Sequence, residues 1–166
     1  MLELFKILFA QTEQRRAINL GVAADVVTKA RINLAAVFVE HLVDVPKGEV
    51  CIFSAHGVST AVEKQAETLG LRTVDATCPL VSSVHRMVER YHRLGYDVAI
   101  IGHHKHPEVE GTAGRVTQGV HVISNEREAT LFEVKDETKV AYVTQTTLSS
   151  HEITSTIETL RKRFPE

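Results

Sequence analysis

Short apolar runs alternate with amphipathic segments from Ala35 onward, and this alternation predicts strands separated by helices. The apolar runs are interpreted as strands because each is short and is bounded by turn residues. They span Ala35–Glu40, Val50–Ser54, Arg72–Asp75, Asp97–Ile101, Val120–Ile123 and Val140–Val143. The second run is almost continuously apolar, which is typical of a parallel strand covered on both faces. We therefore place Cys51, which lies inside it, in the protein core.

Apolar residues that recur three or four positions apart predict the intervening helices. Two of these helices span Thr60–Leu69 and Glu126–Phe132. Another begins at Pro79, with an expected buried stripe of Leu80, Val84, Met87, Val88 and Tyr91. The last helix has an expected buried stripe of Ile153, Ile157, Leu160 and Phe164. The S/T-x-x-E form of a capping box predicts helix starts at Thr60 and Ser149. Gly70 and Gly95 are the expected stops of the first two helices.

Residues 1–33 give a weaker pattern. Apolar residues at helical spacing occur at Leu2, Leu4, Phe5, Leu8 and Phe9, and again at Val22, Val26, Val27 and Ala30. Gly21 separates the two groups, and no strong cap marks either one. We expect helical turns here, and this stretch points to no function.

Strands that alternate with helices form βαβ units, which favour a parallel sheet. Each half of the chain holds a similar set of strands, and the change from one set to the next falls near Cys78. We therefore predict an α/β fold of two small three-layer units with mainly parallel sheets. The units are expected to be residues 1–78 and residues 79–166.

The composition is that of an ordinary globular protein, with 166 residues of which 43% are hydrophobic and 24% charged. The 19 basic and 21 acidic residues are interspersed, which argues against a general nucleic-acid binder with a one-sided basic surface. Two cysteines do not make a disulfide framework, so we expect a reducing, cytoplasmic setting. Neither a signal peptide nor a membrane-spanning stretch is expected.

Polar residues that can do chemistry are concentrated directly after predicted strands. The four stretches are Ser54–Gly57, Thr77–Pro79, Gly102–Thr112 and Thr144–Thr147. Ligands of open α/β sheets bind beyond the carboxyl ends of the strands, so these stretches can converge on one cleft. Imidazoles beside helix N-termini suit phosphate or another anion. Cys78 precedes a helix that begins at Pro79, and the helix dipole there stabilises a reactive thiolate.

Each of these residues also has an ordinary structural explanation. His56 could cap a turn, Glu108 could be a first-turn carboxylate rather than a buried proton donor, and Thr146 could simply enter a helix. The loop histidines His103, His104 and His106 could be solvated. Surface or helix-face positions are expected for His41, His85, His92, His121 and His151, and a solvated last turn for Arg161, Lys162 and Arg163.

Together, these stretches resemble the LytB-type family, the 4-hydroxy-3-methylbut-2-enyl diphosphate reductases of the non-mevalonate isoprenoid pathway. The matching residues are FSAHGVS (53–59), DATCPLV (75–81), GHHKHPEVEGT (102–112), TQTTLS (144–149) and RKRFP (161–165). One such motif alone is a weak signal, whereas all of them in this order are highly specific. The resemblance covers roughly residues 34–166.

The resemblance implies an iron–sulfur oxidoreductase in which three cysteines hold a 4Fe-4S cluster, leaving one iron open to the substrate. Electrons from a donor such as ferredoxin or flavodoxin, together with protons, remove the hydroxyl of a small allylic diphosphate; neither a nucleic acid nor a membrane is an implied partner. By motif, Cys78 resembles a cluster ligand, and His56 and His106 resemble diphosphate-binding residues. Glu108 resembles the proton donor, with Thr146 and Thr147 near the substrate hydroxyl and Thr146 also catalytic.

The chain departs from the family at both ends. Residues 1–33 contain neither a cysteine nor a matching motif, and only one of the three cluster ligands is present. We therefore expect a truncated member with an incomplete first domain (1–78), a second domain (79–166) and no third domain. Its own activity is then in question, and an inactive fragment is one interpretation.

Two alternatives stay open from the residues themselves. The first is an enzyme that uses a Cys–His nucleophile, with Cys78 activated by His56 or His106. The second is a non-catalytic remnant that binds diphosphate, or that binds zinc through Cys78 and the loop histidines His103, His104 and His106.

Overall fold

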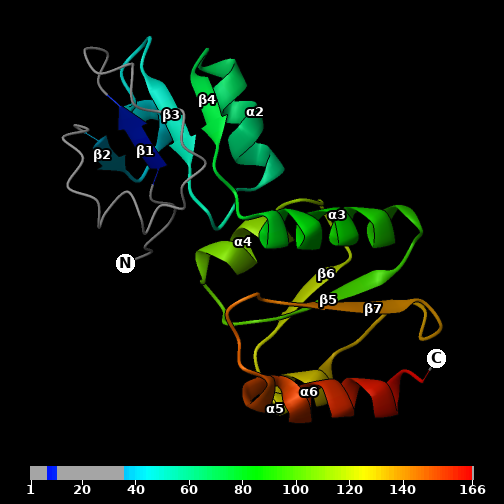
Figure 1. The fold of residues 1–166 in the computed structure, drawn as a ribbon. Coiled ribbons are helices and arrows are strands. Elements are labelled where there is room, and N and C mark those ends of the chain that lie inside the picture. The colour runs from blue at the N-terminus through cyan, green and yellow to red at the C-terminus, as the bar shows by residue number, and fades with distance from the viewer. Residues whose placement is uncertain (1–6, 11–35, 166) are drawn as a thin grey trace.

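The computed structural model describes residues 7–10 and 36–165, which form the α/β fold expected from the sequence (Figure 1). The strands make two separate sheets, one of four strands and one of three. The helical turn expected at Val22–Ala30 lies outside the described residues. No helix in the described part of the chain is long and apolar enough to cross a membrane.

The four-stranded sheet has the order β2-β1-β3-β4. Its strands are β1 (Ile7–Ala10), β2 (Ala36–Val39), β3 (Val50–Phe53) and β4 (Arg72–Asp75). Strand β1 is antiparallel to both of its neighbours, whereas β3 and β4 are parallel. Because β3 and β4 run in the same direction, their carboxyl ends, Phe53 and Asp75, lie side by side.

Strand β1 corrects the expectation of a helical turn around Leu8 and Phe9. The segment is extended and pairs with β2 on one edge and with β3 on the other. A central strand can satisfy its backbone donors and acceptors from both sides, and this tertiary gain overrides a local helical spacing.

One helical layer covers the first sheet. Helix α2 (Thr60–Thr68) and the short 3-10 helix η2 (Leu42–Asp44) contribute Ala66 and Leu42 to a buried cluster with the β3 side chains. Cys51 is 0% exposed in that cluster, which confirms its expected place in the core. The helical layer predicted on the other face of this sheet is not found among the described residues.

The start of α2 differs from the predicted capping box. Ser59, not Thr60, is the N-cap, and its hydroxyl accepts a hydrogen bond from the Val62 amide at 3.3 Å. The Thr60 hydroxyl instead donates to the Arg115 carbonyl at 3.3 Å, in the second half of the chain. The N-cap lies one residue earlier than predicted, which leaves the Thr60 hydroxyl free for this contact. Gly70, at φ +65°, follows the helix as expected.

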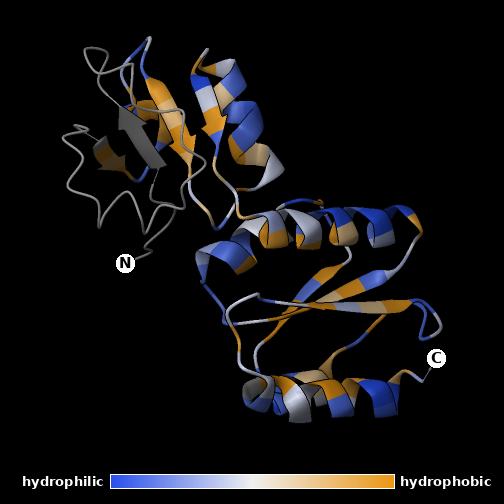
Figure 2. Cartoon of the chain, in the orientation of Figure 1, coloured by the Kyte–Doolittle hydropathy of each residue, from blue (hydrophilic) through white to orange (hydrophobic). Residues whose placement is uncertain are grey.

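The three-stranded sheet is entirely parallel and has the order β6-β5-β7. Its strands are β5 (Asp97–Ile101), β6 (Val120–Ile123) and β7 (Val140–Thr144), and its helices are α3 (Pro79–Arg93), α4 (Pro107–Ala113), α5 (Glu126–Leu131) and α6 (Ser150–Arg163). Every residue of β5 is buried. Figure 2 shows the apolar strand interior between the more polar outer faces of the helices.

Alternate residues of β5 point to opposite faces of this sheet. Val98 and Ile100 belong to a buried cluster with Val88 of α3 and Val109 of α4. Ala99 and Ile101 belong to another, which includes Ala129 of α5 and Leu160 of α6. Helices therefore cover both faces, as Figure 1 shows, and the three-layer prediction is confirmed for this sheet.

Helix α3 begins at Pro79 with Cys78 as its N-cap, as predicted. Val84, Val88 and Tyr91 of the expected stripe do pack in the core, but Leu80 and Met87 do not. Its buried residues are Val81, His85 and Val88, whereas Leu80 is 67% and Met87 42% exposed. The buried residues are themselves four and three positions apart, so helical spacing alone allowed either face. His85, 7% exposed, is therefore not the surface residue that we expected.

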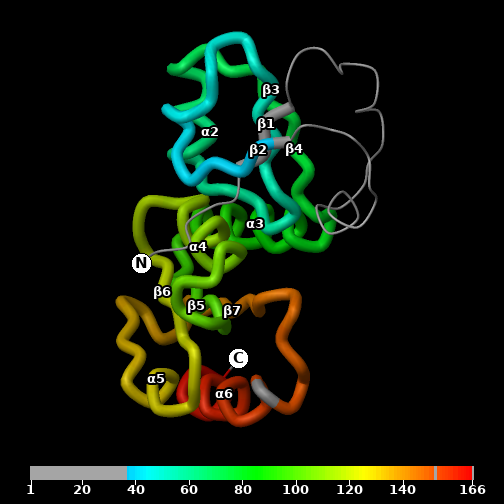
Figure 3. Tube along the Cα trace, turned by 90° about the vertical axis from the view of Figure 1, so that its left-hand side faces the viewer, coloured from blue at the N-terminus to red at the C-terminus, as the bar shows by residue number. Residues whose placement is uncertain are grey.

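The two halves touch where α4 meets the loop that follows β3, a contact seen from the side in Figure 3. A Cβ atom on Gly111 would lie 3.0 Å from the Gly57 carbonyl oxygen, and the Thr60 amide donates to the Gly114 carbonyl at 3.1 Å. Glycines at these helix positions let the two backbones approach closely. The division into domains at residue 78 stays a prediction.

Candidate functional site

The polar stretches follow strands as the sequence predicted. In the first sheet, the Ala76 amide donates to the Phe53 carbonyl at 3.1 Å and the Cys78 amide to the Ala55 carbonyl at 2.9 Å. These bonds hold the loop that carries Cys78 against the loop that carries His56. The first two of the four polar stretches are therefore neighbours.

The loops of the second sheet are tied together in the same way. The Gln145 amide donates to the Ile101 carbonyl at 2.8 Å, and the Gly102 amide donates to the Ile123 carbonyl at 3.0 Å. Both bonds lie just beyond the carboxyl ends of the parallel strands. The loops after β5 and β7 thus share one edge of the sheet, where ligands of such folds bind.

Gln145 is a positioning side chain that the sequence analysis did not single out. It is 4% exposed, its side-chain oxygen accepts the His103 amide at 3.1 Å, and its side-chain nitrogen donates to the Thr147 hydroxyl at 2.8 Å. A polar residue at the end of a buried strand was the available signal. A Cβ on Gly102 would lie 2.6 Å from a Val109 methyl group and 3.1 Å from the Gln145 side-chain oxygen, so glycine is needed there.

Glu108 and Thr146 are joined by two short hydrogen bonds. One carboxylate oxygen accepts the Thr146 amide at 2.7 Å, and the other accepts the Thr146 hydroxyl at 2.9 Å. Glu108 is only 2% exposed, whereas Thr146 lies at the surface. Two directed donors offset part of the cost of burying this carboxylate.

His56 and His106 face each other from the two halves of the chain. Their ring centroids are 5.6 Å apart at an interplanar angle of 85°. His106 is the N-cap of α4, and its Nδ1 accepts the Glu108 amide at 3.2 Å. In the neutral ring this bond leaves the proton on Nε2, as a free donor. Burial, followed by the neighbouring His56, lowers the pKa of His106 below its usual value of 6.5.

Thr147 and Cys78 lie at the margins of this group. Thr147 is exposed and is held by the Gln145 side chain. The Cys78 thiol is partly buried, and within the described residues it forms no hydrogen bond with either imidazole. The Cys–His nucleophile alternative therefore has no preformed pair in this structure.

The cysteine set does not fit a cluster held by three thiolates. The whole sequence contains two cysteines, and Cys51 lies in β3 at 0% exposure. Burial raises the pKa of its thiol to about 11, which disfavours the thiolate that a metal requires. Cys78 is the remaining thiol. The chain's own residues thus supply one ligand of the three that the resemblance implied.

The zinc alternative also lacks its ligands. Within residues 7–10 and 36–165, no group of three or more His, Cys, Asp or Glu side chains is arranged to hold a metal ion. Instead, His104 pairs with Glu128 at 2.9 Å. The Ser124 amide, which donates to the carboxylate, lowers the pKa of Glu128 to about 2, with a further contribution from His104. The loop histidines are therefore not gathered around Cys78.

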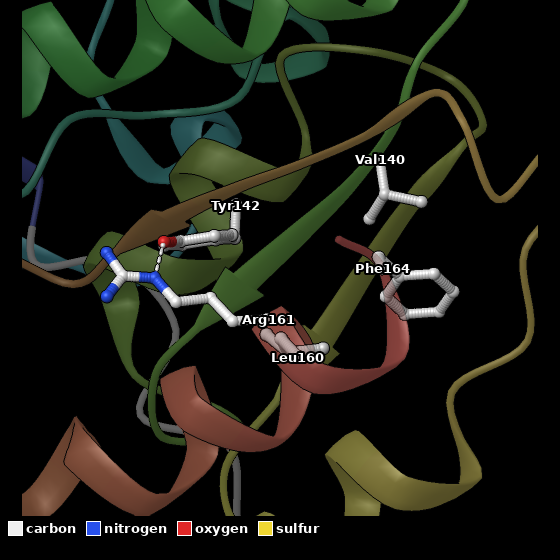
Figure 4. A pocket seen from close by; sticks show the side chains of 5 residues that line it. All are labelled: Val140, Tyr142, Leu160, Arg161 and Phe164. Carbon is white, nitrogen blue, oxygen red and sulfur yellow. Dashed lines mark hydrogen bonds between the residues drawn. The ribbon is translucent and has the colours of Figure 1, made fainter. Parts of the chain in front are cut away.

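A separate cavity of about 340 Å³ lies between β7 and α6, away from these residues (Figure 4). Val140, Tyr142, Leu160, Arg161 and Phe164 line it. Arg161 is exposed, as expected of the last helical turn, and its Nε also donates to the Tyr142 hydroxyl at 3.0 Å. None of the six predicted site residues lines this cavity.

Comparison with known proteins gives one consistent result. Residues 18–166 match the family model described as LytB protein, so the match begins earlier than the residue 34 expected from the motifs. A relative from Desulfotalea psychrophila, named 4-hydroxy-3-methylbut-2-enyl diphosphate reductase, is 61% identical over 130 residues, which is 78% of this chain and 42% of the relative. A protein of the same name from Azoarcus is 51% identical over 130 residues, again 78% and 42% of the two chains.

Solved structures agree with the sequence matches. The Plasmodium falciparum E-1-hydroxy-2-methyl-but-2-enyl-4-diphosphate reductase matches with a TM-score of 0.74 and 37% identity, over 78% of this chain and 41% of that one. A structure titled (E)-4-hydroxy-3-methyl-but-2-enyl diphosphate reductase, the terminal enzyme of the non-mevalonate pathway, matches with a TM-score of 0.60 and 31% identity, covering 67% and 40%. The chain spans about two fifths of the length of the curated relatives that it matches.

Proposed function

This chain belongs to the LytB protein family, and we propose that it carries the substrate-binding and proton-donating part of a 4-hydroxy-3-methylbut-2-enyl diphosphate reductase. The contact that supports this most directly is Glu108 with Thr146, next to the facing rings of His56 and His106. One end of this group suits an anion, and the other suits a hydroxyl group that must leave.

The two imidazoles bind the diphosphate end of the substrate in this proposal. The free Nε2 donor of His106 and the exposed ring of His56 are available to the same anion. Phosphate oxygens accept hydrogen bonds from both rings, and a bound anion favours their protonated forms. The two rings thus suit the diphosphate group of a small allylic diphosphate, the substrate class indicated by the names of the relatives.

Glu108 and Thr146 serve the hydroxyl end. Removing an allylic hydroxyl by reduction breaks the C–O bond, takes up two electrons and two protons, and releases water. Glu108 is 2% exposed and is covered by Thr146, so a proton from outside reaches the departing oxygen in two linked transfers. The Thr146 hydroxyl gives its own proton to that oxygen, and a protonated Glu108 replaces it, which reverses the direction of the hydrogen bond between the two side chains. Thr147, held by Gln145, stands beside this path and orients the hydroxyl.

The electrons require a redox group and a donor that these residues do not supply. A 4Fe-4S cluster, reduced by a ferredoxin or flavodoxin in the cytoplasm, would supply them when bound. Cys78 is the single thiolate that this chain offers such a cluster. These 166 residues do not contain three thiolates for the cluster, so its other ligands would have to come from outside them.

Calorimetric titration of the chain tests the proposal with three ligands. These are the hydroxylated allylic diphosphate, isopentenyl diphosphate, which lacks the hydroxyl, and inorganic diphosphate. We expect H56N and H106N to weaken all three by about tenfold, as loss of a charged hydrogen bond does. Asn at position 106 can still cap α4, which separates anion binding from helix stability.

T146V should remove the preference for the hydroxylated ligand and leave inorganic diphosphate unchanged. H41N is the matched control, because His41 is exposed and forms no side-chain cap bond at η2. Failure of the chain to bind any of the three ligands would overturn the proposal. So would binding that H56N and H106N affect no more than H41N does.

A further inference from the structure

Arg115 connects both halves of the chain through two carboxylates. Its Nη1 donates to Glu63 on α2 at 2.6 Å, and its Nε donates to Glu89 on α3 at 2.8 Å. We call Arg115, Glu63 and Glu89 the Arg115 network. The Arg115 side chain is 17% exposed, and each carboxylate partner is about twice as exposed. The network joins helices that pack on different sheets.

The network also reaches the loop that carries His56. Arg115 Nη1 donates to the Val58 carbonyl at 3.3 Å, and the Arg115 carbonyl accepts the Thr60 hydroxyl at 3.3 Å. The Thr60 amide donates to the neighbouring Gly114 carbonyl at 3.1 Å. Three hydrogen bonds therefore join the residues just after His56 to the residues just after α4.

Helix α4 is a short spacer between this contact and the candidate site. His106 is its N-cap, and Arg115 follows its C-cap residue, Gly114. Between them, Gly111 lies against the Gly57 carbonyl. Two segments that touch at one point can pivot, whereas contacts at both ends of a helix fix their angle. The spacing of the two imidazoles thus depends on contacts at the far end of α4.

The Arg115 guanidinium stays charged around neutral pH. Burial by itself lowers the pKa of Arg115, but the hydrogen bonds that Arg115 donates to Glu63 and Glu89 outweigh it, and the pKa is raised above its ordinary value. A planar guanidinium can serve two carboxylates and a carbonyl at fixed angles, which an ammonium group cannot do. The arginine is thus a fixed cation at the junction of three helices.

We propose that Arg115 is a positioning residue that sets the separation of His56 and His106, and through it the affinity of the site for a diphosphate group. The affinity part rests on the function proposed above, whereas the positioning part does not. Arg115 touches neither imidazole and acts through the His56 loop and α4.

R115M and R115K test the proposal, with R163M as the matched control. Arg163 also donates to a backbone carbonyl, that of Ala129 at 2.6 Å, but it joins α6 to α5 away from the network. Two readouts are measured well below each variant's unfolding temperature. The first is the pKa of His106 from ¹⁵N-imidazole NMR, and the second is the affinity for inorganic diphosphate by calorimetry.

We expect the pKa of His106 to rise toward 6.5 in R115M, since separating the rings removes the burial and the His56 neighbour that lower it. The groups facing His106 are His56, Glu108 and His103, so the charge of Arg115 is not itself a major influence on this pKa. Diphosphate affinity should fall about tenfold, as on loss of one hydrogen bond to a charged group, because the two imidazoles no longer reach the same anion. In R115K both the rise in the His106 pKa and the fall in diphosphate affinity should be smaller than in R115M. R163M should change neither quantity.

An unchanged pKa of His106 in R115M, or a change equal to that in R163M, would overturn the positioning role. If wild type binds no diphosphate but the pKa of His106 moves as expected, the positioning stands and the proposed function fails. If wild type binds diphosphate and R115M binds it equally well, the affinity part of this inference is wrong while the proposed function stands.

Discussion

The Glu108 carboxylate accepts both polar hydrogens of Thr146, the amide at 2.7 Å and the hydroxyl at 2.9 Å. These residues are 38 positions apart, and the contact joins α4 to the loop after β7. It places a buried carboxylate directly beneath an exposed hydroxyl. The buried carboxylate contributes to the stability of the fold, whereas the exposed hydroxyl can contact a ligand. The two contributions can therefore be measured separately.

E108Q should destabilise the chain, because a neutral amide replaces the charged carboxylate that accepts both Thr146 donors, and the Thr146 hydroxyl must turn to accept from the new NH₂ group. Replacing hydrogen bonds to a charged acceptor by neutral ones costs about 1–3 kcal/mol. The free energy of unfolding from urea titration measures this loss. E110Q is the matched control on the same helix, since Glu110 is only partly buried and is expected to change stability by less than about 0.5 kcal/mol. Equal effects of the two substitutions would contradict the assigned contact.

Much of the fold could be predicted from local sequence. Strands such as β5 and β7 were evident from apolar runs, and the start of α3 from Pro79 after Cys78. The placing of the polar stretches after strands followed from this pattern. Strand β1 could not be predicted, because its neighbours in the sheet come from distant parts of the chain.

The contacts between residues of the candidate site could not be predicted from the sequence either. Motifs suggested Glu108 and Thr146 separately, but only the parallel register of β5 and β7 brings their loops together. Arg115 gave no local signal, because its partners Glu63 and Glu89 lie on other helices. His85 was misplaced because helical spacing does not reveal which face is covered.

G57A should cost more stability than the backbone conformation alone explains. Gly57 has φ +74°, and a Cβ there would lie 2.6 Å from Cε1 of the buried His85 ring. The left-handed conformation costs an L residue about 1–2 kcal/mol, and the clash adds to it. G48A isolates the first cost, because Gly48 has φ +86° with nothing within 4 Å. Equal losses in the two variants, by urea titration, would show that His85 does not press on this turn.

His85 should make the chain less stable below neutral pH. Burial, followed by the charge of Arg115, lowers the pKa of His85 from 6.5 to about 4 in the folded chain. The unfolded chain therefore binds the proton more readily. The contribution of neutral His85 to the free energy of unfolding is complete above pH 6.5 and decreases as the pH falls from 6.5 to 4. The total loss from this residue is at most about 3 kcal/mol.

Urea titrations at several pH values measure this dependence, and H85Q should flatten it between pH 4 and 6.5. The lowered pKa of His106 adds a smaller slope of the same sign, which H85Q leaves in place. Glu128 affects stability at lower pH, because its folded pKa is about 2 and its stabilising contribution is lost as the pH falls from 4.5 to 2. A wild-type curve that is flat from pH 4 to 6.5 would contradict the buried, neutral imidazole.

Alkylation should distinguish the two cysteines. Cys78 is partly exposed, whereas Cys51 is 0% exposed and burial raises the pKa of its thiol to about 11. A pulse of iodoacetamide at neutral pH, read by mass spectrometry, should label Cys78 in the native chain and both residues in urea. Native labelling of Cys51 at the rate of Cys78 would show that the β3 core is open.

The most direct test of the site is a crystal structure of this chain grown with inorganic diphosphate. Our account predicts the anion between the two halves, with oxygen atoms within hydrogen-bond distance of both the His56 and the His106 rings. Density for the anion elsewhere, such as beside Arg161 at the cavity between β7 and α6, with no anion at the two imidazoles, would contradict it.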